Sequence, residues 1–70
     1  MTAPRMHLMR EHGYSEAALL NRVRGDPGLR ADVEAELRAC DDVIAVRGAA
    51  ACVITAKYAE ILRRVLAQAG

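Results

Sequence analysis

Histidine, cysteine and aspartate are the residues of this chain that could do chemistry, but their spacing forms no recognisable site. His7 and His12 are five residues apart, whereas a helical pair of metal ligands is usually four residues apart. Asp41 and Asp42 are adjacent, and adjacent side chains in a strand point to opposite faces. We therefore expect no general acid–base pair, no metal site and no cofactor. The sequence predicts a protein that is not an enzyme.

The two cysteines, Cys40 and Cys52, are not part of a CxxC motif. Because a free cysteine behaves as a small hydrophobic residue, we expect both to pack in the core. A disulfide between them and a metal site are the alternatives.

The chain carries neither a signal peptide nor a membrane span that we can identify. Arg5, His7 and Arg10 lie where a signal peptide would be apolar. The longest apolar run, residues 49–56, is too short to cross a bilayer. The sequence therefore predicts a cytoplasmic protein with reduced thiols and no membrane partner.

Length and composition limit the chain to one small domain, residues 1–70. An apolar content of 53% is sufficient for a core, although a chain of this size has little surface to bury. The formal net charge is +1, yet residues 26–42 hold six acidic and two basic residues. The rest of the chain is therefore basic, which is compatible with an anion-binding face.

Three helices are expected before residue 42. The first covers residues 4–13 and ends at Gly13. Ser15 is expected to cap a second helix that runs to Arg24, and Asp26 with Pro27 is expected to start a third. In the third helix, residues 27–40, an apolar face is formed by residues at i, i+4, i+8 and i+11: Leu29, Val33, Leu37 and Cys40.

Residues 43–55 are expected to form a two-stranded hairpin. Both ends of this segment are rich in β-branched residues, which favour strands: Val43, Ile44, Val46, Val53, Ile54 and Thr55. Gly48 can take a positive φ in the turn between them. From Tyr58 the apolar period is that of a helix, with Tyr58, Ile61, Leu62, Val65, Leu66 and Ala69 on one face.

This order of elements resembles the winged helix-turn-helix family, an α+β fold. The segments VIAVRG, CVITA and KYAEIL are similar to the C-terminal winged-helix modules of the selenocysteine-specific translation elongation factor. The resemblance implies a recognition helix at residues 27–40 and a wing tip at residues 47–51. A strand that the family often has between its first two helices finds no candidate here beyond Tyr14. The alternative is an all-α bundle in which residues 42–68 form one or two helices.

The resemblance implies nucleic-acid binding, and arginines could provide it. Arg22, Arg24 and Arg30 bracket the link before residues 27–40, where a helix amino end favours an anion, and Arg47 lies at the expected wing. The expected outer face of residues 27–40 has no amide or hydroxyl side chain to read bases, so we expect contacts to the phosphate backbone. The elongation-factor modules bind an RNA hairpin, which favours RNA over DNA.

The alternative function is protein binding by the acidic third helix, as an adaptor or as a homodimer. Ala31 and Ala35 would let a partner helix approach closely, and Glu34 and Arg38 lie on the same expected face. Flanking charges would select a basic partner or a second copy. Glu34 and Arg38 are also spaced to pair with each other at i, i+4.

Overall fold

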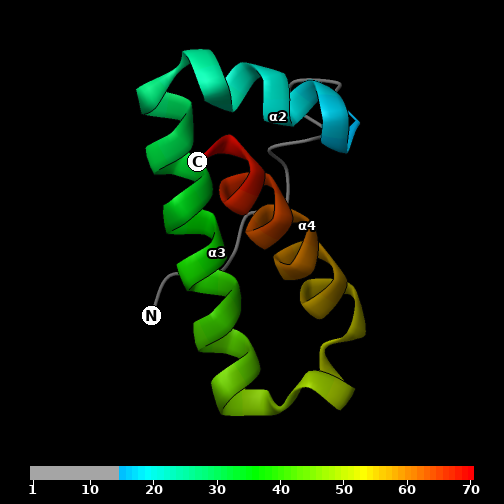
Figure 1. The fold of residues 1–70 in the computed structure, drawn as a ribbon. Coiled ribbons are helices and arrows are strands. Elements are labelled where there is room, and N and C mark those ends of the chain that lie inside the picture. The colour runs from blue at the N-terminus through cyan, green and yellow to red at the C-terminus, as the bar shows by residue number, and fades with distance from the viewer. Residues whose placement is uncertain (1–14) are drawn as a thin grey trace.

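Three helices build the part of the chain that the structure describes, residues 15–70 of a computed structural model. They are α2 (Glu16–Gly25), α3 (Pro27–Arg47) and α4 (Val53–Ala69), with a 3₁₀ turn, η1 (Ala49–Ala51), before α4. Figure 1 shows α3 and α4 as a helical hairpin, with α2 lying across one end of it. The predicted helix at residues 4–13 lies outside the described residues, as do His7, His12 and Tyr14.

Both predicted helix caps, Ser15 and Asp26, are confirmed. Ser15 is the N-cap of α2, and its Oγ accepts a hydrogen bond of 3.3 Å from the N–H of Ala18. Asp26 caps α3, where its Oδ1 accepts a bond of 3.0 Å from the N–H of Leu29. Each cap satisfies a backbone donor that the first helical turn leaves without a partner. Because α2 ends at Gly25 and α3 begins at Pro27, a single residue joins the two helices.

The predicted hairpin of strands is wrong, and with it the α+β winged-helix fold. Residues 15–70 contain no strand, since α3 continues past Cys40 to Arg47 and α4 begins already at Val53. The expected recognition helix is therefore seven residues longer, and the expected wing tip is a helix end and a 3₁₀ turn. The all-α alternative fits this structure.

Burial explains why Val43 and Ile44 are helical although they are β-branched. A β-branched residue costs less than about 1 kcal/mol relative to alanine in a helix. Ile44 packs against the core, and Val43 is half-buried. Burying an isoleucine side chain contributes about 1.5–3 kcal/mol, so the tertiary contact outweighs the local preference.

Gly48 turns the chain with the positive φ that the sequence predicts, but it does so between two helices. Its φ is 87° and its ψ is 145°. Its N–H donates a bond of 2.7 Å to the carbonyl oxygen of Ile44, which closes the end of α3. The next residues form η1 and lead into α4.

The core lies where the three helices meet. Its buried members come from every helix: Leu19, Val23, Leu29, Val33, Cys40, Tyr58, Ala59, Leu62 and Val65. The predicted apolar face of the last helix is confirmed, with Ile61, Leu66 and Ala69 half-buried at its edges. Both cysteines are buried and free, as expected of small core residues.

Replacing Gly48 with alanine tests the turn. A side chain would meet no atom within 4 Å at this position, so any effect comes from the backbone. The φ and ψ of Gly48 are ones that almost only glycine adopts, and we expect Gly48→Ala to lower the free energy of unfolding by about 1–3 kcal/mol. Urea denaturation followed by circular dichroism measures the change.

Gly25→Ala is the matched control, because an added side chain there also meets nothing within 4 Å and the φ is not positive. We expect this variant to be neutral or more stable by up to about 1 kcal/mol. Equal losses in the two variants would contradict the turn.

Candidate functional site

The four arginines predicted to bind nucleic acid do not share one surface. Arg22 and Arg24 lie in the last turn of α2, and Arg30 lies in the first turns of α3. Arg47 is the last residue of α3. At 1.5 Å of rise per residue, Arg47 lies about 25 Å from Arg30 along the helix.

Internal contacts occupy Arg24 and Arg30, which lie near the α2–α3 link. The Nε of Arg30 lies 3.3 Å from Oε1 of Glu34, and Nη2 of Arg24 donates a bond of 3.4 Å to the carbonyl oxygen of Gln68. The predicted pair of Glu34 with Arg38 is therefore replaced by a pair with Arg30. The carboxylate of Asp26 already lies at the amino end of α3, where a phosphate was expected.

Arg63 and Arg64, on α4, form ion pairs with the other two helices. The guanidinium of Arg64 donates to both carboxylate oxygens of Glu16 in α2, at 2.9 and 3.1 Å. The Nη2 of Arg63 donates to Oδ1 of Asp41 in α3 at 2.8 Å. The hydrogen bonds from Arg64, helped by its charge, lower the pKa of Glu16, while the partial loss of water opposes this. The same contact raises the pKa of Arg64.

The four residues predicted to bind a protein partner do share one face. Ala31, Glu34, Ala35 and Arg38 are all exposed on α3, and their spacing places them on the side opposite the buried residues. Figure 1 shows no labelled helix on this outer side of α3.

Sequence reasoning missed a second surface, at the end of the α3–α4 hairpin. The exposed large apolar residues of the described chain gather at this end: Val46 at 69%, Val53 at 54% and Ile54 at 75% exposure. The signal was present in the sequence. A helical segment this rich in valine and isoleucine has more apolar side chains than one buried face can hold.

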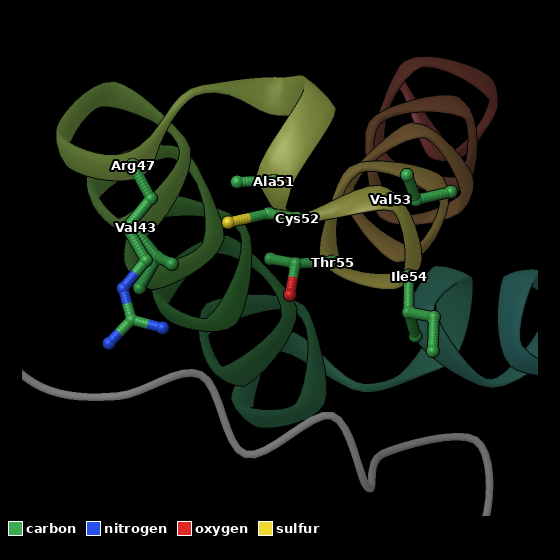
Figure 2. Close-up of a pocket in the computed structure, with 7 residues that line it drawn as sticks. All are labelled: Val43, Arg47, Ala51, Cys52, Val53, Ile54 and Thr55. Atoms are coloured by element: carbon green, nitrogen blue, oxygen red, sulfur yellow. The ribbon is translucent and has the colours of Figure 1, made fainter.

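An open cavity of about 360 Å³ lies between the two helices at this end. Its lining comes from the last turns of α3, the link and the first turn of α4: Val43, Arg47, Ala51, Cys52, Val53, Ile54 and Thr55. Figure 2 shows Val43 and Arg47 on one side, with Cys52 and Thr55 opposite. Arg47 is the one charged residue of this lining.

Residues 15–70 contain neither a cluster of metal-ligating side chains nor a membrane-spanning helix. No group of three His, Cys, Asp or Glu residues there could hold a metal ion. None of the helices described is both long enough and apolar enough to span a bilayer.

Comparison with known proteins gives no relative. The chain matches no protein-family model, and no curated protein and no solved structure is significantly similar to it.

Acidification tests the contact between Glu16 and Arg64. The pKa of Glu16 is lower in the folded chain than in the unfolded chain. The contact with Arg64 therefore stabilises the fold fully above the ordinary glutamate pKa, about 4.3. This stabilisation is lost as the pH falls through the pKa of Glu16 in the folded chain. We expect Glu16→Gln to lose less stability than the wild type between pH 7 and pH 3, measured by urea denaturation at each pH.

Asp32→Asn is the control for this experiment, because Asp32 is exposed and makes no ion pair with a described residue. It should keep the wild-type pH profile. If Glu16→Gln and the wild type lose stability in parallel, the contact does not act in solution.

Thiol labelling tests the surroundings of Cys40. Burial, followed by the nearby charges of Glu36 and Asp41, raises the pKa of this thiol to about 11. At pH 8 only about one thiol in a thousand would be ionised, compared with about a quarter at the ordinary pKa. We expect iodoacetamide to label Cys40 at least about 100-fold more slowly in the folded chain than in urea, as measured by peptide mass spectrometry.

An exposed thiol on another helix provides the comparison. Ala67 is exposed on α4, so an Ala67→Cys variant should be labelled at similar rates with and without urea. Rapid labelling of Cys40 in the folded chain would show that the core opens easily.

Proposed function

We propose that this chain is a non-catalytic protein-interaction module that binds an apolar segment of another protein at the end of the α3–α4 hairpin. The observation that carries the proposal is the exposure of Val53 and Ile54 beside an open cavity. Exposed apolar side chains that gather at one place mark binding surfaces more often than isolated ones do.

The energetic gain from covering this surface is substantial. Ile54 is 75% exposed, so a partner that covers it would remove most of its side chain from water. Full burial of an isoleucine side chain contributes about 1.5–3 kcal/mol. Val53 adds a second, smaller contribution from the same turn of α4.

The shape of the surface favours a partner with one apolar anchor residue. The cavity is open and lined mainly by apolar side chains, and interface energy is commonly concentrated where an anchor side chain fills such a pocket. An aliphatic or aromatic side chain fits this description.

Arg47 gives the surface its charge preference. It is exposed, lines the cavity, and has no ionic partner among the described residues. A guanidinium in this position can form a bidentate pair with a carboxylate. We therefore propose that the partner carries an aspartate or glutamate close to its apolar anchor.

This geometry favours protein over nucleic acid as the partner. The arginines expected to contact phosphates are spread along α2 and α3, and Arg24 and Arg30 contact groups of the chain itself. Affinity for a nucleic-acid backbone grows with the number of phosphates that are neutralised together, which dispersed arginines do not provide.

A random peptide library displayed on phage tests the proposal. We expect the selected peptides to combine an apolar residue with a nearby acidic one. Each of Ile54→Ser and Arg47→Glu should weaken binding of a selected peptide by at least about tenfold, or about 1.4 kcal/mol, as measured by calorimetry.

Arg38→Glu is the control, because it makes the same charge change on the exposed side of α3, away from the cavity lining. It should leave peptide affinity unchanged. Selection of no peptide, or of peptides whose binding ignores both variants, would overturn the proposal. Binding of a fluorescent RNA at low salt that is lost in Arg24→Ala and Arg30→Ala would favour nucleic acid instead.

A further inference from the structure

The outer face of α3 has the pattern of a helix-pairing seam that nothing covers in the described part of the chain. Its members are exposed and alternate in steps of four and three residues: Ala31, Ala35, Arg38, Asp42 and Ala45. This repeat averages 3.5 residues, the period that keeps one helix in contact with a second along its length. It is separate from the apolar stripe that faces the core.

Two opposite charges at the middle of this seam have no ionic partner among residues 15–70. Arg38 and Asp42 are four residues apart, yet neither makes an ion pair with the other or with any described residue. The neighbouring i, i+4 pair, Arg30 with Glu34, does form. Within the described part of the chain, the seam therefore presents one cation and one anion that a second helix could pair with.

We propose that two copies of this chain pair through this face, with their α3 helices antiparallel. In an antiparallel pair, residue numbers increase along one helix while they decrease along the facing helix. A two-fold axis near Cys40 then places Arg38 of each copy opposite Asp42 of the second copy. The same register places Ala35 opposite Ala45. A parallel pair would instead set Arg38 against Arg38.

The small residues make this arrangement close enough for the charges to act. Alanine layers on both sides of the charged layers let the helix axes approach the lower end of the usual range, about 8 Å. Val46, which is largely exposed beside Ala45, lies at the edge of the seam and would be partly buried. The surface is thus complementary to itself in shape and in charge, as an isologous interface requires.

The size of the contact sets its strength. From Ala31 to Ala45 the seam is about 21 Å long at 1.5 Å per residue. A contact of one helix on each side buries less than the roughly 800 Å² per partner of a standard interface. The dimer should therefore dissociate on dilution.

Sedimentation equilibrium of the full chain over a range of concentrations tests the proposal without any other protein. We expect a monomer–dimer equilibrium in the wild type. Arg38→Asp and Asp42→Arg each set like charges against each other and should weaken dimerisation by at least tenfold. The double variant with both changes exchanges the charges and should restore it.

Lys57→Asp is the matched control. Lys57 is exposed on α4 and has no ionic partner among the described residues, so this variant makes the same charge change as Arg38→Asp away from the seam. It should dimerise like the wild type, and circular dichroism should show equal helix content in all variants.

Cross-linking tests the register even if a charge variant does not fold. A mixture of Ala35→Cys and Ala45→Cys chains should form a disulfide-linked heterodimer on mild oxidation, and each chain alone should cross-link much less. The proposal would be overturned if the wild type stays monomeric or if the double variant does not recover dimerisation. It would also be overturned if two Ala35→Cys chains link to each other more readily than an Ala35→Cys chain links to an Ala45→Cys chain. None of these outcomes depends on the peptide-binding surface.

Discussion

Burial of one apolar stripe of α4 against both α2 and α3 is the interaction on which the fold depends. Leu62 and Val65 on this stripe are almost fully buried, and they contribute more stability than any surface contact. The ion pairs of Arg63 and Arg64 lie at the two edges of α4 and connect it to different helices. Exposed pairs add little energy, so we assign them a role in fixing the rotation of α4.

Local signals in the sequence predicted the local features of the fold. The caps at Ser15 and Asp26 and the positive φ of Gly48 depend on residues no more than four positions away. The core stripe of the last helix was also predictable, because helical periodicity reports which side of a helix is buried. These features do not depend on how the helices are arranged.

The arrangement itself could not be predicted from these signals. Local preference for strand or helix in residues 43–55 differs by only a few tenths of a kcal/mol per residue, so tertiary contacts such as that of Ile44 with the core can outweigh it. The exposure of Ile54 could not be predicted either, since the expected hairpin would have placed this residue in a sheet. The pair of Glu16 with Arg64 joins residues 48 positions apart, which no helical spacing predicts.

The single residue between α2 and α3 also determines where this chain can be altered. Asp26 accepts a bond from Leu29, and its own N–H donates to the carbonyl oxygen of Val23, so one residue finishes one helix and begins the next. Because only one residue joins the two helices, lengthening this link would move α2 away from the α3–α4 hairpin on which it packs. The exposed link at residues 48–51 is by contrast the place in the described chain where protein engineers could open new termini or insert a reporter domain.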